Sequence, residues 1–175
     1  MAEPKVCVSL EAITVEEMID EATRANIAGA DYVEVRFDKL YLNKPEPITM
    51  VNDDGEEYSK MPPIEEWGVK DFEEIDVEQA IANLKEGIPV PVVFTARAVR
   101  EGGFFAGTEQ ERLQILEQGI KSEVSFVDLE LSIEKKSRDK LVKLASSSNC
   151  QVIASIHETK AVSYTHLRAH ETFRY

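Results

Sequence analysis

Residues 32–38, Tyr-Val-Glu-Val-Arg-Phe-Asp, alternate charged and apolar side chains in a segment rich in β-branched and aromatic residues. A period of two places Glu34 and Arg36 on one face of a strand and the apolar residues on the other. An edge strand with one solvated face would explain this pattern. The segment is, however, the second of five similar ones, which favours an interior strand of a parallel sheet, covered on both faces. Its charged residues are therefore candidates for a functional site.

Four further apolar segments also run into polar residues. They occupy Pro4–Leu10, Val92–Thr95, Phe126–Leu131 and Val152–Ile156. The polar residues within or just after them are Ser9, Arg97, Asp128, Glu130 and His157. In a barrel of parallel strands and helices, reactive groups gather at the carboxyl ends of the strands. The repeated placement predicts one shared site.

Helix signals lie between these segments. Thr14–Glu17 and Thr108–Glu111 match capping boxes, and Asp76 is expected to cap a helix over 77–86 that Gly87 ends. Another helix is predicted over 133–145, and the Pro- and Asp-rich residues 41–72 predict a surface excursion that includes a hairpin. Strands alternating with helices predict an α/β fold with a parallel sheet: an incomplete (β/α)8 TIM barrel with about five strands and four helices.

Composition limits the classes of function. The chain has 175 residues, 43% of them hydrophobic, and a net charge of -13. That charge argues against binding to nucleic acid or to anionic membrane surfaces, although Arg36 and Arg97 could form a local positive pocket for an anionic small substrate. Cys7 and Cys150 lie among apolar residues without metal-ligand spacing. With no signal peptide in the sequence, they predict buried, reduced thiols in a cytoplasmic protein.

The last residues change in character. Residues 162–172 show no apolar period and resemble, over eleven consecutive residues, the translation of a common transposase-based sequencing adapter. We therefore expect a barrel portion at 1–161 and a non-native tail at 162–175, in preference to a natural polar tail. His157 is then the only native histidine.

Three groups invite a chemical interpretation. A neutral imidazole at His157 can take and return a proton near neutral pH, although a buried structural histidine would give the same pattern. The guanidinium of Arg97 can bind a carboxylate through two hydrogen bonds or form a salt bridge with Glu34 or Asp128. Glu101, followed by two glycines, predicts a turn that returns a carboxylate over the barrel mouth. For Asp128 and Glu130, pairing with the arginines inside the barrel is an equally good interpretation.

Together these residues resemble the type I 3-dehydroquinate dehydratases, the Schiff-base enzymes of the shikimate pathway. The matching segments occur in family order and are 8–10, 31–38, 94–97, 101–103, 126–130 and 154–158. The resemblance implies a hydro-lyase that converts 3-dehydroquinate to 3-dehydroshikimate and water without a metal or a diffusible cofactor. It leaves a homodimer of the full-length protein as one option.

The resemblance also implies roles for individual residues. His157 matches the residue that removes the substrate proton, and Glu101 matches the carboxylate that holds this histidine. The positions that match substrate-binding residues are Ser9, Glu34, Arg36 and Arg97. In the family a lysine forms an imine with the substrate ketone, and the protonated imine acidifies the adjacent carbon.

Two departures qualify the match. Glu158 stands where the family usually has Asp, and the imine lysine is missing. Lys160 lies too close to His157, and Lys39 is in the wrong element. We therefore expect a fragment that is inactive by itself. The alternatives are a non-catalytic binding module on a partial barrel, or another imine-forming barrel lyase or aldolase, against which the spacing from Arg97 to Glu101 counts.

Overall fold

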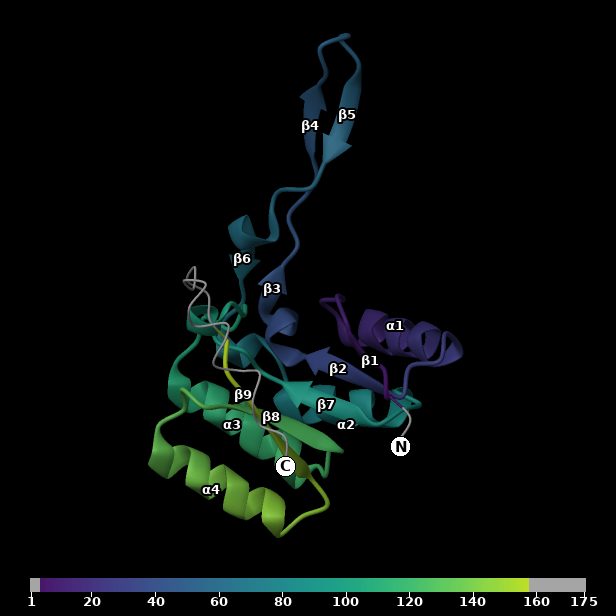
Figure 1. The fold of residues 1–175 in the computed structure, drawn as a ribbon. Helices are drawn as coiled ribbons and strands as arrows, with labels where there is room; N and C mark the ends of the chain where they lie inside the picture. Colours follow the sequence, from purple (N-terminus) through teal and green to yellow (C-terminus); the bar gives the residue numbers. More distant parts are fainter. Residues whose placement is uncertain (1–3, 158–175) are drawn as a thin grey trace, which may run out of the picture.

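A five-stranded parallel sheet forms the body of the protein (Figure 1). The computed structural model describes residues 4–157, so the predicted tail at 162–175 and the domain boundary at 161 lie outside the described residues. The sheet has the order β1-β2-β7-β8-β9. Its strands are β1 (Cys7–Ser9), β2 (Tyr32–Arg36), β7 (Val92–Thr95), β8 (Phe126–Glu130) and β9 (Gln151–Ser155). All five predicted strands and their parallel pairing are confirmed.

Four α-helices connect the strands, as predicted. They are α1 (Val15–Ile27), α2 (Val77–Gly87), α3 (Glu109–Lys121) and α4 (Lys135–Ser146). The capping box of α3 is complete, whereas at α1 only the Thr14 hydroxyl accepts a bond, from the Glu17 N–H. The prediction that α4 begins at Ile133 was wrong. Ile133 is buried in the core, and the Glu134 carboxylate accepts the Ser137 N–H as the cap. No helix within residues 4–157 is long and apolar enough to cross a bilayer.

The segment between β2 and α2 forms an arm that extends away from the sheet (Figure 1). Its base is an antiparallel pair, β3 (Leu42–Asn43) with β6 (Gly68–Val69), and its tip is the hairpin β4 (Ile48–Val51) with β5 (Glu57–Lys60). Every residue of the tip strands is exposed. This confirms the predicted surface hairpin. The remaining short helices are 3-10 turns: η1 (Phe37–Tyr41), η2 (Ile64–Glu66), η3 (Phe72–Glu74) and η4 (Val99–Glu101).

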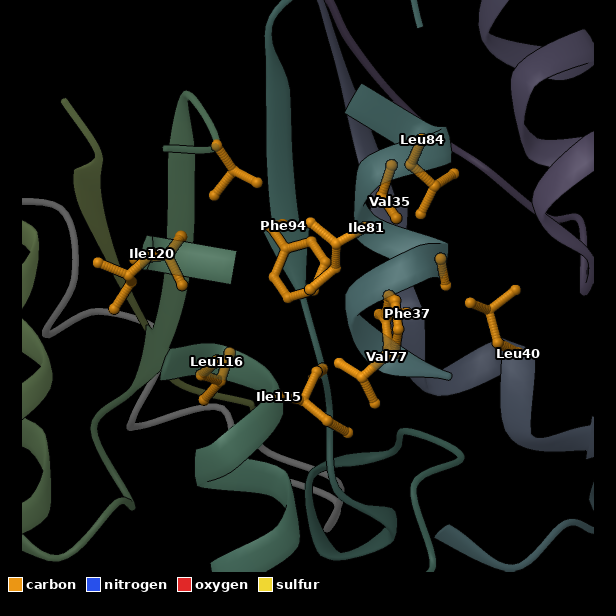
Figure 2. Packing of buried hydrophobic residues seen from close by; sticks show 14 of the residues in the cluster. Val35, Phe37, Leu40, Val77, Ile81, Leu84, Phe94, Ile115, Leu116 and Ile120 are labelled. Carbon is orange, nitrogen blue, oxygen red and sulfur yellow. The ribbon is translucent and has the colours of Figure 1, made fainter. Parts of the chain in front are cut away.

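The hydrophobic core lies between the sheet and its helices (Figure 2). Val35 and Phe94 from the sheet pack with Ile81 of α2 and Ile115 of α3, each at most 1% exposed. Gly119 allows α3 to pack closely against Phe94, because a Cβ atom at this position would lie 2.8 Å from the Phe94 ring. The alternation predicted along β2 is thus confirmed. Val33 and Val35 are fully buried in this core, and Glu34 lies on the opposite face of the strand.

The two ends of the described sheet are less covered. Val8 of β1 and Val152 of β9 are 36% and 37% exposed. Cys7 is also exposed, which corrects the prediction of a buried thiol, because β1 lies at the end of the sheet order. Cys150 is buried, and burial raises the pKa of its thiol to about 11.

Candidate functional site

Strand register brings the polar residues of the sheet to one edge. Ser9 pairs with Glu34 between β1 and β2, and Arg36 pairs with Thr95 between β2 and β7. Glu130 pairs with Ser155 at the ends of β8 and β9. Because the strands are parallel, these positions all lie toward their carboxyl ends. These side chains therefore lie at the edge of the sheet that the sequence predicts.

Arg97 follows β7 and lies among three carboxylates. Its Nη2 is 3.4 Å from Glu34 Oε1 and 3.5 Å from Asp128 Oδ2, and its Nε is 3.9 Å from Glu130 Oε1. The Thr95 hydroxyl donates to the same Glu34 oxygen at 2.9 Å. The salt bridges suggested as an alternative for Arg97 are thus present, and Asp128 and Glu130 are interior acids that face this arginine.

Arg36 is engaged in a separate pair. Its guanidinium donates two hydrogen bonds to Asp38, at 3.0 Å and 2.7 Å, and Asp38 is fully buried. Asp38 also accepts the backbone N–H of Phe104 at 3.0 Å. The expected positive pocket of Arg36 and Arg97 is therefore not what the structure shows, because both arginines already face carboxylates. The alternation expected over residues 32–38 ends at Arg36, where the chain turns into η1, so it does not account for this pairing.

Glu101 reaches the histidine through a tight turn. The Ala98 carbonyl accepts the N–H groups of Glu101 and Gly103, and Gly102 has a φ of 75°. Gly103 lies so close to the end of β7 that a Cβ there would be 2.2 Å from the Arg97 carbonyl oxygen. The turn is the one predicted from the two glycines.

The carboxylate of Glu101 meets His157 two residues after the end of β9. Oε2 accepts the backbone N–H of His157 at 3.3 Å and lies 3.4 Å from its Nδ1. Burial raises the pKa of Glu101, but the hydrogen bonds from Ser132 and from the His157 backbone, together with the nearby imidazole, outweigh burial and lower the pKa. The structure thus brings together a carboxylate and an imidazole, the arrangement used for general acid–base chemistry.

Several buried polar atoms at this edge have no hydrogen-bond partner among the described residues. They are Arg97 Nε, Asp128 Oδ1, Glu130 Oε1, Ser155 Oγ and His157 Nδ1. Buried polar groups are almost always satisfied, so a cluster of open donors and acceptors is typical of a site that receives a polar ligand, water or further chain. We call these five residues, with Glu34 and Glu101, the polar cluster.

Sequence reasoning missed Arg112, which supports the polar cluster from α3. Its side chain is fully buried and donates to Glu130 Oε2 at 2.5 Å and to the Ala96 carbonyl at 3.0 Å. A signal was present: Arg112 shares the helical face of Ile115, Leu116 and Gly119, where an apolar residue is expected. Burial raises the pKa of Glu130, with smaller contributions from Glu101 and Asp128, while Arg112 and Arg97 act in the opposite direction.

Lys39 is the buried lysine among the described residues. Its ammonium pairs with the Glu11 carboxylate and its side chain is 3% exposed. It also lies 5.9 Å from the centre of the Phe104 ring. A paired, enclosed ammonium is a poor nucleophile, which agrees with the exclusion of Lys39 as an imine-forming residue.

Comparison with known proteins identifies a family. A sequence profile described as Type I 3-dehydroquinase matches residues 6–167, which includes residues 162–167 of the segment expected to be adapter-derived. The 3-dehydroquinate dehydratase of Desulfotalea psychrophila is 27% identical over 159 residues, covering 91% of this chain and 54% of that protein. The enzyme of the same name from Methanosarcina acetivorans is 28% identical over 149 residues, covering 84% and 50%. The chain spans about half the length of these relatives.

Solved structures share the fold. The 3-dehydroquinate dehydratase of Enterococcus faecalis superposes with a TM-score of 0.68 at 22% identity, covering 97% of this chain and 60% of that one. A type I 3-dehydroquinate dehydratase from Clostridium difficile, with covalently modified comenic acid, gives 0.62 at 21% identity, covering 88% and 51%. These matches confirm the predicted part of a (β/α)8 barrel.

Proposed function

Because the chain belongs to the type I 3-dehydroquinase family, we propose that it acts in the dehydration of 3-dehydroquinate to 3-dehydroshikimate, a lyase step of the shikimate pathway. The observation that carries this proposal is the contact of Glu101 with His157 beside a cluster of open polar atoms. A carboxylate and an imidazole so placed can accept a proton from a substrate carbon and return it to a leaving hydroxyl.

His157 is the proposed proton carrier. In a Schiff-base mechanism the protonated imine draws electrons from the adjacent carbon, so a base of moderate strength can remove its proton. The carboxylate of Glu101 lies against Nδ1 and so leaves Nε2 free to face the substrate. The same imidazole, once protonated, can donate to the departing hydroxyl, which leaves as water.

Arg97 and Glu34 are proposed to bind the substrate ring. Three carboxylates around Arg97 make this part of the site unfavourable for a further carboxylate, whereas hydroxyl groups can both donate to Glu34 and accept from Arg97. We therefore assign the ring hydroxyls of 3-dehydroquinate to this region. Ser9 beside Glu34, and Arg36 with its partner Asp38, complete the proposed binding edge.

The imine lysine is proposed to lie outside residues 1–175. Lys39 is paired with Glu11, and Lys160 is too close in sequence to His157 to extend from a following strand. A polypeptide without this lysine has no electron sink, so His157 would face a carbon acid too weak to deprotonate quickly. We therefore propose that the 175-residue polypeptide alone does not turn over.

The test compares the 175-residue chain with the product of the complete open reading frame. Each is incubated with 3-dehydroquinate, and formation of the conjugated enone is followed by ultraviolet absorbance. Borohydride is then added and the mass of the protein measured. We expect turnover and a covalent adduct only for the complete product. Its His157→Ala variant should still form the adduct but turn over very slowly.

Each contrary outcome overturns a different part of the proposal. Ordinary turnover by the 175-residue chain would overturn the assignment of the lysine. A complete product that binds 3-dehydroquinate without dehydrating it would favour the non-catalytic binding module. An unchanged rate in His157→Ala would overturn the assignment of the base.

A further inference from the structure

Arg112 is a charged side chain in a position where the helix period calls for an apolar one. It lies in α3, and none of its surface is exposed. Its Nη1 donates to Glu130 Oε2 and to the Ala96 carbonyl, while Nε and Nη2 donate to Glu109 at 3.0 Å and 2.7 Å. Burying a charged group costs free energy even when all its hydrogen bonds are made, so packing alone does not explain Arg112. Its partners indicate what it does.

The first partner, Glu130, lies between Arg112 and Arg97. Its Oε2 is bound by Arg112, whereas its Oε1 is 3.9 Å from Arg97 Nε and has no hydrogen-bond partner among the described residues. Arg97 Nε is likewise without a partner in that part of the chain. One carboxylate thus faces two guanidinium groups but bonds only the one on α3, and the edge of Arg97 remains open.

The other partners lead to the remaining parts of the site. Ala96, whose carbonyl accepts from Arg112, directly precedes Arg97. Glu109 accepts from Arg112 and also from Arg100 at 2.9 Å, and Arg100 belongs to the turn η4 that carries Glu101. Arg112 therefore joins α3 to both sides of the polar cluster.

We propose that Arg112 is a positioning residue for the reaction, which rests on the proposed function. By holding Glu130 it keeps this carboxylate from closing on Arg97, so that the Nε edge of Arg97 stays available for a substrate hydroxyl. Through Glu109 and Arg100 it also fixes the turn from which Glu101 reaches His157. The planar fork of arginine supplies these bonds in several directions, which a lysine ammonium does not reproduce.

The test uses the complete gene product with three variants: Arg112→Lys, Arg112→Met and the double variant Arg112→Met/Glu130→Gln. The first readout, independent of activity, is the ¹⁵N–¹H signal of Arg97 Nε. In Arg112→Met the freed Glu130 should bond this group, moving the proton signal downfield and slowing its exchange with water. The double variant should return the signal toward its position in the unsubstituted protein, because the amide that replaces the Glu130 carboxylate carries no charge.

The second readout is kinetic. We expect kcat to fall more than tenfold in Arg112→Met, to recover in part in the double variant, and to stay low in Arg112→Lys. Arg24→Met is the matched control, since Arg24 is exposed in the last turn of α1 and lies on another helix than Arg112. Its kcat should not change.

The two readouts separate this inference from the proposed function. A shifted Arg97 signal in a protein without dehydratase activity would uphold the role of Arg112 and overturn the function. An unchanged signal together with an unchanged kcat per folded molecule in Arg112→Met would overturn the inference. If Arg112→Met does not fold, an unchanged Arg97 signal together with an unchanged kcat in Arg112→Lys would likewise overturn it.

Discussion

Glu101 Oε2 lies 3.4 Å from Nδ1 of His157, although 56 residues separate the two in the chain. The contact joins a turn after β7 to the segment that follows β9, across the intervening strand β8. The carboxylate also accepts the backbone N–H of His157, so it bonds the backbone and lies beside the ring nitrogen. This double contact is what turns an isolated histidine into a candidate base.

Replacing Glu101 by Gln should therefore disturb the histidine without removing bulk. We expect kcat of the complete product to fall by about 10²-fold or more, the usual range for an impaired acid–base group. The ¹⁵N shifts of the ring should also show a loss of the Nδ1–H tautomer. Glu117→Gln is the control, because Glu117 is an exposed partner of Lys121 on α3. Wild-type kcat in Glu101→Gln would contradict the role given to this carboxylate.

Gly103→Ala should displace the same turn from the backbone side. The new Cβ would lie 2.2 Å from the Arg97 carbonyl oxygen, and a backbone atom cannot move aside cheaply. We expect a loss of about 1–3 kcal/mol in the free energy of unfolding, measured by urea denaturation, and a weaker Glu101–His157 contact. Gly68→Ala is the matched control, since its Cβ would meet Asn43 at an ordinary 3.6 Å. Equal stability of the two variants would show that the turn has room to adjust.

The hairpin of β4 and β5 should be dispensable for folding. Its residues are exposed and Figure 1 shows it extending away from the sheet, so its removal takes nothing from the core. Replacing residues 48–60 by a short Gly-Ser linker, with β3 and β6 kept, should change the free energy of unfolding by less than about 0.5 kcal/mol. A large loss of thermal stability would show that the hairpin packs against the body in solution.

Much of the fold could be predicted because its signals are local. Alternation marks β2, and side-chain caps at Thr108 and Asp76 mark the starts of two helices within a residue. Ile133 misled the prediction for α4 because burial in the core, rather than helical periodicity, explains that apolar residue. The burial predicted for Cys7 was wrong because the coverage of a strand depends on where the strand lies in the sheet.

The gathering of the candidate residues at one sheet edge was predictable from the sequence, but their pairings were not. Strand-end placement brought Glu34, Arg97 and His157 to one edge, as the parallel register requires. The charge balance there depends on which acid each arginine meets, and those partners come from other strands and from α3. Arg112 could be noticed as a charge on an apolar face, but its contact with Glu130 needs the packed structure.

Acid should destabilise the protein, because several carboxyl groups have lowered pKa values when folded. The hydrogen bond from Lys5 lowers the pKa of Asp31, and backbone N–H groups at the start of α4 lower that of Glu134. Burial would raise the pKa of Glu109, but its bonds to Arg112 and Arg100 outweigh burial and lower it. A lowered folded pKa means that the unfolded chain binds more protons, so stability is full above the ordinary values of 3.8 and 4.5 and is lost as pH falls through the folded values.

The raised pKa of Glu130 acts in the opposite sense, since its protonation on acidification relieves a buried charge. Because the carboxyl groups with lowered pKa values outnumber Glu130, we expect Tm to fall steadily between about pH 5 and pH 3. Glu109→Gln should lower Tm at pH 7, where the ion pairs with Arg112 and Arg100 are intact, and should show a smaller further loss at low pH. Glu117→Gln provides the comparison for an exposed acid. A Tm that rose on acidification, or a Glu109→Gln protein with an undiminished acid dependence, would show that these pairs do not set the pH dependence of stability.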